Sequence, residues 1–124
     1  MKIMEAIASI DELKPNGYSL EVKLAWLSYL DGMIKREIID THQGAEMTEF
    51  TAYDVNTDEQ TELLVQEPFA QELYISFLEN QIDYFNGETA KYNNSLMKYQ
   101  GAYAAYSRWY NRTHLPIGAK RKYW

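Results

Sequence analysis

A short run of oxygen-bearing side chains at residues 54 to 58, Asp-Val-Asn-Thr-Asp, has the alternate spacing with which a calcium-binding loop begins. Such a loop also needs a glycine at its sixth position, where the chain turns sharply, and a bidentate glutamate at its twelfth. These two positions are Glu59 and Val65 in this chain. We therefore expect no calcium site here.

The two histidines, His42 and His114, each lie near the end of a predicted helix. A histidine in that position commonly interacts with the last carbonyl groups of the helix. Neither has an acidic residue at ligand spacing, and the chain contains no cysteine to complete a zinc site. We expect helix-end contacts from both histidines, and neither a metal nor another cofactor.

Sequence motifs for catalysis are missing. The chain has no GxSxG, no HExxH, no phosphate-binding glycine loop and no cysteine nucleophile. The acids in the middle of the chain lack the basic or apolar partners that tune a carboxyl group for general acid or base work. The sequence predicts that the protein is not an enzyme.

The stretch YQGAYAAYSRWYNRTHLP, residues 99 to 116, is unusually aromatic. On a helix its tyrosines fall on one side beside small alanines, over which a second helix could approach closely. Single-strand binders pair such rings with a basic groove, which this acidic chain does not provide. A core or a protein interface is favoured over base stacking, and the candidate interaction residues are Tyr99, Tyr103, Tyr106, Arg108, Trp109, Tyr110, Arg112, Lys120, Arg121, Lys122 and Trp124.

Charge is distributed unevenly along the chain. Thirteen acids and no Lys or Arg occur from Glu37 to Glu88, whereas five bases and no acid occur from Arg108 to Trp124. A long acidic region repels nucleic acid and attracts cationic partners. The candidate acidic surface consists of Glu46, Glu49, Asp54, Asp58, Glu59 and Glu62.

The length of 124 residues suits one domain with a small core. Without cysteine, nothing in the chain requires an oxidising compartment. Glu5, Asp11 and Glu12 interrupt the region where a signal peptide would be apolar, and no stretch is apolar enough to span a membrane. We expect a soluble protein in a reducing cytoplasm.

Apolar residues three and four apart predict helices over most of the chain. The first covers residues 3 to 13, and the second begins after an N-cap at Ser19 and runs to about Thr41. Asp31 falls inside the apolar stripe of the second helix, so we expect an Arg or a backbone donor near it. The helical faces predict a core that contains Leu27, Ile34, Ile38, Leu78, Ile82 and Tyr103.

Helical spacing is interrupted over residues 43 to 67, which form either a short hairpin of FTAY with TELLV or an extended loop. It resumes from Pro68 to Thr113, where a single helix would be ~69 Å long and too long for this domain. Asn86-Gly87 and Asn93-Asn94-Ser95 are two places where the chain could reverse. We expect two helices, roughly 68–92 and 95–113.

These elements predict an all-α fold: a small bundle of about four helices with an acidic insertion between the second and the third. The bundle forms a single helical domain over residues 1–115. Residues 116–124, which begin at Pro116, are expected to be a flexible, basic and aromatic C-terminal tail.

Three stretches of the chain together carry a resemblance to a known family: IDELKPNGYSLEVKLAWLSYLDGMIKREIIDTH, TELLVQEPFAQELYISFLENQIDYFNGETAKYNNS and AYSRWYNRTHLP. They resemble small proteins of tailed bacteriophages and prophages of Gram-positive bacteria, of the head–tail connector (adaptor) kind. The resemblance implies a helical structural protein of the virion, located at the head–tail interface after assembly in the host cytoplasm. It also implies a homo-oligomeric ring, by resemblance a dodecamer, that docks under the portal protein and carries the next connector or a tail protein.

The resemblance further implies that the ring extends the DNA channel and lets DNA pass without specific binding. No membrane is expected among the partners. Acidic walls suit such a channel because like charge prevents tight phosphate contacts. Two alternatives stay open. One is a small helical regulator that binds nucleic acid through its basic tail. The other is a helper of capsid assembly or DNA packaging that never closes a ring.

Overall fold

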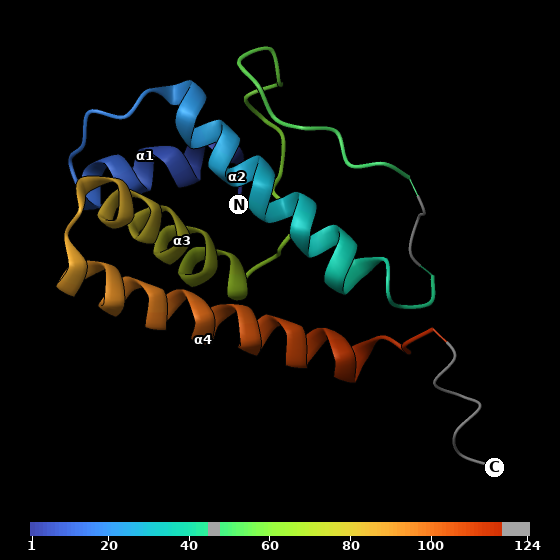
Figure 1. The fold of residues 1–124 in the computed structure, drawn as a ribbon. Coiled ribbons are helices and arrows are strands. Elements are labelled where there is room, and N and C mark those ends of the chain that lie inside the picture. Colours follow the sequence, from blue (N-terminus) through green and yellow to red (C-terminus); the bar gives the residue numbers. More distant parts are fainter. Residues whose placement is uncertain (45–47, 118–124) are drawn as a thin grey trace.

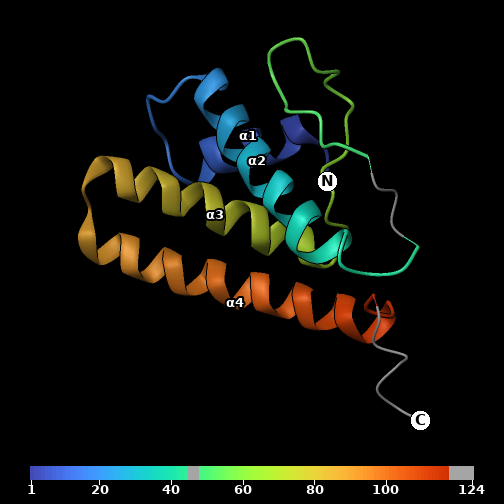
Figure 2. The same ribbon diagram turned by 45° about the vertical axis from the view of Figure 1, so that its right-hand side comes forward.

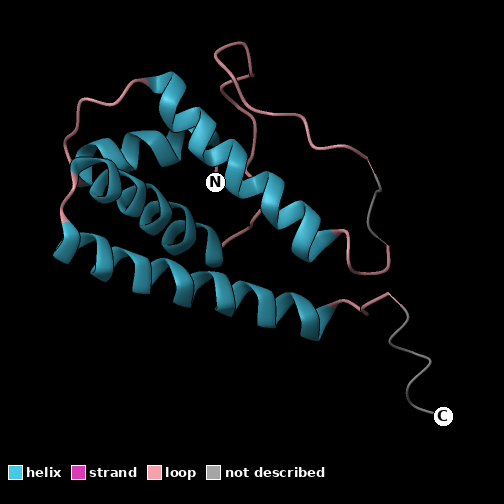
Figure 3. Cartoon of the chain, in the orientation of Figure 1, coloured by secondary structure: helices cyan, strands magenta, loops and turns pink. Residues whose placement is uncertain are grey.

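The computed structural model describes residues 1–44 and 48–117, and this part of the chain is helical without a strand (Figure 3). Its elements are α1 (Ile3–Leu13), α2 (Leu20–Ile34), the π-helical turn η1 (Lys35–Ile39), α3 (Phe69–Asn86) and α4 (Thr89–Thr113). The predicted all-α bundle with an insertion between its second and third helices is confirmed. Of the two alternatives for the insertion, the extended loop is the one observed.

The central helix of the bundle is α3. It contacts α1 and α2 on one side and α4 on the other (Figure 1). The loop between η1 and α3 runs mainly over the side formed by α1 and α2, whereas α4 follows the opposite side of the molecule in both Figures 1 and 2. The body of the bundle therefore separates most of the insertion from α4.

The first two helices begin where the sequence predicts. The hydroxyl oxygen of Ser19 accepts a hydrogen bond from the N–H of Val22 at 3.2 Å and caps α2. After Ile34 the helix widens into η1, which ends at Ile39 rather than near Thr41. The predicted second helix is thus an α-helix continued by one π-helical turn.

The turn between α3 and α4 follows Asn86, so the predicted helices 68–92 and 95–113 have the wrong boundary. Gly87 ends α3 in the left-handed conformation at φ 72°, which glycine adopts without steric cost. Ser95 instead lies inside α4 and is buried, and its hydroxyl donates a hydrogen bond to Asp83 Oδ2 at 2.8 Å. Because this bond satisfies the hydroxyl against α3, the polar segment 93–95 stays helical.

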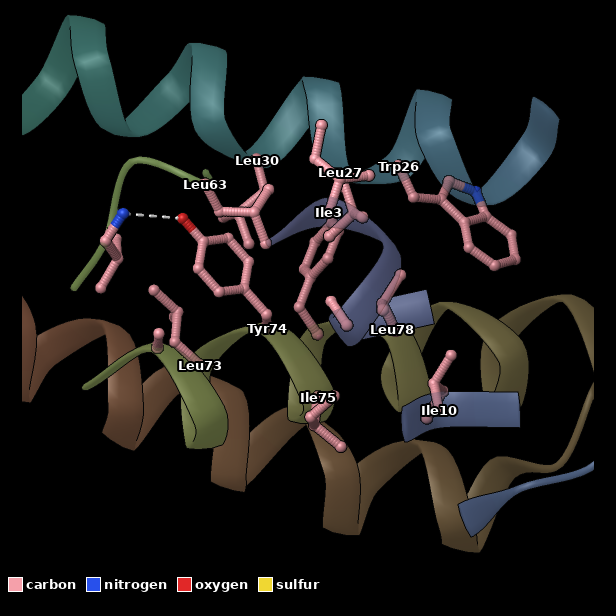
Figure 4. Close-up of a cluster of buried hydrophobic side chains, with 14 of the residues drawn as sticks. Ile3, Ile10, Trp26, Leu27, Leu30, Leu63, Leu73, Tyr74, Ile75 and Leu78 are labelled. Carbon is pink, nitrogen blue, oxygen red and sulfur yellow. Dashed lines mark hydrogen bonds between the residues drawn. The ribbon is translucent and has the colours of Figure 1, made fainter. Parts of the chain in front are cut away.

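The core lies between α1, α2 and α3. In Figure 4, aliphatic side chains from these three helices meet around Leu27 and Leu78. The buried members of the predicted core are Leu27, Ile34, Ile38, Leu78 and Ile82.

Tyr103 was also predicted to be largely buried, and this prediction is wrong. Tyr103 is only half-buried, whereas Tyr106 is 1% exposed and takes the buried position on α4. The hydroxyl of Tyr103 donates to Glu37 Oε2 at 2.9 Å at the exposed edge of the contact. The polar end of Tyr103 therefore keeps its ring at the flank of the bundle.

Replacement of Leu27 or Ile82 by alanine should lower the free energy of unfolding by ~2–5 kcal/mol, because each side chain is fully buried and leaves a cavity. Urea denaturation followed by circular dichroism measures the change. Leu13→Ala is the matched control, since Leu13 is 67% exposed and its loss should change stability by less than ~0.5 kcal/mol. Equal effects at the buried and exposed positions would contradict the assigned helix faces.

Candidate functional site

The acidic insertion is held on the bundle by one buried carboxylate, that of Asp31 in α2. Its Oδ2 accepts hydrogen bonds from the hydroxyl of Tyr53 at 2.6 Å and the N–H of Leu64 at 3.1 Å. Its Oδ1 accepts a hydrogen bond at 2.6 Å from the hydroxyl of Tyr74 in α3. Of the two predicted alternatives, an Arg or a backbone donor, the backbone donor is the one observed, and two phenols donate beside it.

Tyr74 links this carboxylate to the end of the insertion. Its hydroxyl donates to Asp31 and also accepts a hydrogen bond from the N–H of Val65 at 2.9 Å, drawn as the dashed line in Figure 4. Burial raises the pKa of the Asp31 carboxyl, and the hydrogen bonds from its three donors oppose that rise. Burial and the neighbouring carboxylate raise the pKa values of the Tyr53 and Tyr74 phenols.

Contacts with α2 fix the first part of the insertion. The N–H of Tyr53 donates to Ser28 Oγ at 3.1 Å, and the ring of Phe50 packs against that of Tyr53 with centroids 5.2 Å apart. A Cβ atom on Gly32 would meet the ring of Phe50 at 3.4 Å, so this ring lies close to the backbone of α2. The insertion therefore has a defined position on the bundle.

At its other end the insertion pairs with the N-terminus of the chain. The N–H of Leu63 donates to the carbonyl oxygen of Met1 at 2.8 Å, and the N–H of Ile3 donates to that of Thr61 at 3.0 Å. The terminal ammonium group forms an ion pair with Glu62 Oε2 at 2.9 Å. One of the predicted acidic-surface residues, Glu62, is thus neutralised within the protomer.

The remaining described acids of the predicted surface point to solvent. Glu49, Asp54, Asp58 and Glu59 are exposed, and none forms an ion pair with another described residue. Asp54 Oδ1 accepts from the N–H of Asn56 at 2.8 Å, and Asp58 Oδ1 accepts from that of Gln60 at 2.8 Å. These two carboxylates cap local turns. In residues 1–44 and 48–117, no group of three or more His, Asp or Glu side chains could hold a metal ion.

The outer surface of α4 has the opposite charge. The helix contains no acid and four bases, and all four are exposed: Lys91, Lys98, Arg108 and Arg112. Arg108 follows the buried Tyr106 by two residues, about 200° around an α-helix, so it points away from the core. Lys91 Nζ lies 3.2 Å from Glu88 Oε2, and Lys98 Nζ lies 3.8 Å from Glu79 Oε1. Neither arginine forms an ion pair with a described residue.

The tyrosine side of α4 faces into the protomer. Tyr106 is buried, and its ring contacts Phe69 of α3 with centroids 5.7 Å apart. The half-buried rings on either side also pack against the core, and they belong to Tyr99, Tyr103, Trp109 and Tyr110. Tyr106 is therefore a core residue and not an interface residue, because a partner protein cannot reach it in the folded protomer.

Both histidines lie where the end of η1 meets the end of α4. His42 is buried, and its Nδ1 lies against the carbonyl oxygen of Ile38, which is the helix-end contact that the sequence predicts. Its Nε2 is 2.7 Å from Asn111 Oδ1 of α4. The ring of His114 stacks on Tyr110 with centroids 3.8 Å apart, and the two histidine rings are 6.3 Å apart.

The segment after α4 is attached at this junction. The N–H of Gln43 donates to the carbonyl oxygen of Leu115 at 2.8 Å, and the N–H of Ile117 donates to that of Thr41 at 3.0 Å. Pro116 and Ile117, the first residues of the predicted tail, are therefore paired with the chain after η1. The other predicted interaction residues, Lys120, Arg121, Lys122 and Trp124, lie outside the described residues, as does Glu46.

Beside this junction, a groove of about 690 Å³ separates the start of the insertion from α2 and η1. Its apolar lining includes Tyr29, Met33 and Phe50, and its acidic lining is Glu37, Asp40 and Glu49. The sequence did not predict this groove, because the residues come from three separate segments with no common spacing. Only Glu49 was predicted to belong to a site.

No protein-family model, curated protein or solved structure matches this chain. In residues 1–44 and 48–117, no helix has both the length and the apolar character needed to cross a membrane. Function is therefore inferred from the surfaces described above.

Stability should fall as the pH rises above about 10, the ordinary pKa of a phenol. The pKa values of the Tyr53 and Tyr74 phenols are raised in the folded protein, so the unfolded chain loses these protons first and unfolding becomes more favourable with rising pH. Each phenol should lower the free energy of unfolding by up to ~1.4 kcal/mol per pH unit. Urea denaturation between about pH 8 and 11 measures this slope.

Tyr74→Phe should reduce the slope, because one of the phenols with a raised pKa is gone. The same variant should also destabilise the protein by ~1–3 kcal/mol at neutral pH, since Asp31 and the N–H of Val65 each lose a partner. Tyr84→Phe is the control, since Tyr84 is 60% exposed and should leave both quantities unchanged. The same slope in Tyr74→Phe as in the wild type would contradict the role given to Tyr74.

Proposed function

We propose that this chain is a structural subunit of a tailed-phage head–tail connector, which assembles head to tail into a ring beneath the portal protein. The observation that carries the proposal is the separation of charge across the protomer. Exposed acids lie on the insertion over the α1 and α2 side, and exposed bases lie on the outer side of α4. The resemblance of the sequence to connector proteins agrees with this assignment.

A ring closes through heterologous contacts, in which one surface of a protomer meets a different surface of its neighbour. The insertion and α4 are two such surfaces, and they lie on opposite sides of α3. Asp54, Asp58 and Glu59 have no ionic partner among the described residues, and the same holds for Arg108 and Arg112. In the proposed ring, the acids of one copy contact the bases of the next.

Connector subunits form a channel for DNA, and the acidic balance of the chain, with a net charge of −6, suits that task. Negative side chains on a channel wall repel phosphate groups and prevent the counterion release on which tight DNA binding depends. The proposal places the protein in the virion, at the head–tail interface, with the portal protein and the next connector or a tail protein as its neighbours. Its role there is mechanical and requires no catalytic residue.

Charge exchange between the two surfaces tests the ring contact. An insertion variant carries Asp54→Asn, Asp58→Asn and Glu59→Lys, in which asparagine keeps the oxygen that caps each turn. An α4 variant carries Arg108→Glu and Arg112→Glu. Each variant should add little or no ring to portal-bearing, DNA-filled heads, because the opposite charges of the contact are removed or replaced by like charges, whereas the combination in one chain should partly restore the ring. Electron microscopy of the head vertex measures occupancy.

The matched control is Glu12→Lys with Glu21→Lys, which changes two exposed acids outside the insertion and should leave occupancy at the wild-type level. Circular dichroism checks that each variant remains folded. Wild-type protein that adds no density below the portal, or that binds elsewhere on the virion, would contradict the connector proposal. If the insertion variant and the α4 variant each form a ring as well as the wild type does, the proposed contact between the insertion and α4 is wrong, although the connector proposal itself is not contradicted.

One observation favours a second candidate, a helical regulator that binds nucleic acid. The 25 residues of α4 contain four exposed bases and no acid, and such a helix surface can contact phosphate groups. The acids of the insertion weigh against it, because their field repels DNA at longer range. Binding to DNA by the isolated protein therefore separates the two candidates.

Under the connector proposal, the wild-type protein should not retard duplex DNA at physiological salt in a gel-shift assay. Replacing Glu49, Asp54, Asp58 and Glu59 by the corresponding amides should create weak binding that decreases as salt increases, because the repelling charges are removed. Tight binding by the wild type would favour the regulator.

A further inference from the structure

The groove between α2, η1 and the start of the insertion lies directly beside the point where the described chain stops. Asp40, which lines the groove, precedes Thr41, and the carbonyl oxygen of Thr41 accepts the hydrogen bond from the N–H of Ile117. Seven residues follow Ile117, with the sequence GAKRKYW. Fully extended, seven residues reach ~23–25 Å, which is enough to cross a groove of about 690 Å³.

We propose that this groove is the docking site for residues 118–124 of the same chain. The proposal goes beyond the connector function and holds whether or not the protein forms a ring. It rests on the position of Ile117 and on the match between the lining of the groove and the composition of the segment.

The charges of the two partners are complementary. The segment carries Lys120, Arg121 and Lys122 without an acid, and the charged lining of the groove has one more acid than base: Glu37, Asp40 and Glu49 against Lys35 and Arg36. Asp40 already pairs with Lys35 at 2.7 Å, and Glu37 accepts a hydrogen bond from the Tyr103 hydroxyl. Glu49 is exposed and has no ionic partner among the described residues, so it is the principal acid for the incoming bases.

The apolar part of the groove suits the aromatic end of the segment. The ring of Tyr29 is 67% exposed, and Met33 and Phe50 are half-buried beside it. Burial of Tyr123 and Trp124 against these side chains removes apolar surface from water on both partners. Arg36 also lines the groove and is exposed, and its guanidinium group is suited to stack on an aromatic ring.

Attachment at Ile117 favours binding within one chain over binding between chains. The hydrogen bonds at Thr41 and Gln43 hold the beginning of the segment at the rim of the groove. A short tether of this kind gives the segment an effective concentration in the millimolar range, so even a weak peptide site is occupied. A neighbouring copy has no such advantage in dilute solution.

A spin label tests the proposal, because the chain contains no native cysteine to compete for the label. A cysteine added after Trp124 and labelled with a nitroxide should attenuate the amide resonances of Gly32, Met33 and Glu49 in the full chain. The resonance of Tyr84, which is near the C-terminal end of α3 and does not line the groove, should keep its intensity. The spin-labelled, isotope-labelled protein is then diluted into an excess of protein that carries neither label. The attenuation should stay the same, because the contact lies within one chain.

Variants that remove a charge or an aromatic side chain test the specificity of the contact. Glu49→Gln together with Trp124→Ala should strongly reduce the attenuation at Gly32, whereas Glu72→Gln, an exposed acid of α3 away from the groove, should not change it. Raising the salt concentration should reduce the attenuation as well, because the contact includes exposed charges.

Three outcomes would overturn the proposal. They are equal attenuation over the whole molecule, attenuation centred on Tyr84 and the α3–α4 turn, and attenuation that disappears on dilution with unlabelled protein. None of these outcomes bears on the ring, which the head-binding experiment tests separately.

Discussion

The position of the insertion depends on one buried carboxylate with three donors. Asp31 is 0% exposed, and its two oxygens receive hydrogen bonds from Tyr53, Tyr74 and the N–H of Leu64. Removing a carboxylate from water is unfavourable unless hydrogen bonds replace those of the solvent. The site therefore constrains the three segments that supply donors, and it joins α2, the insertion and α3 at one point. Without it, the insertion would keep its contacts near Ser28, Gly32 and the N-terminus and the buried side chains of Leu63 and Val65.

Fixing the insertion on this side of the bundle determines where the charges lie. Only its first residues, near His42 and Gln43, contact the end of α4, and the part that carries residues 54 to 59 lies on the α1 and α2 side with α3 between it and α4. The acids at residues 54 to 59 and the bases of α4 therefore do not neutralise each other inside the protomer. A chain with the same composition but a mobile insertion would lose this separation. The buried network at Asp31 thus links the fold to the proposed head-to-tail contact.

The sequence predicted the helices well because each has a local signal. Apolar spacing marked α1 and α2, Ser19 marked a cap, and Asp31 was expected to need a donor. The identity of the donors could not be predicted, because Tyr53 and Tyr74 are 22 and 43 residues away from Asp31 and only the folded chain brings them together. The same limit applies to the groove, whose residues have no shared period.

The turn before α4 and the buried tyrosine show why local signals can fail. Two polar segments had turn-forming composition, and the choice between them depended on Ser95, whose hydroxyl is satisfied by Asp83 of the preceding helix. Tyr103 and Tyr106 lie three residues apart on the same aromatic stripe. Tyr106 takes the buried position, and the hydroxyl of Tyr103 donates to Glu37 at the flank. In both cases the outcome goes with a polar contact between separate elements, which the apolar pattern does not contain.

The two kinds of polar contact in this protein respond differently to salt. The hydrogen bonds of Asp31 are buried and are screened little by ions. The proposed contacts of the insertion with α4 of a neighbouring copy are exposed, and charges separated by more than ~8 Å are largely screened at physiological ionic strength. The protomer therefore keeps its shape under conditions in which contacts between copies are weak. A subunit with this division would stay folded and dispersed in solution, and would associate where a portal ring holds several copies side by side and raises their local concentration.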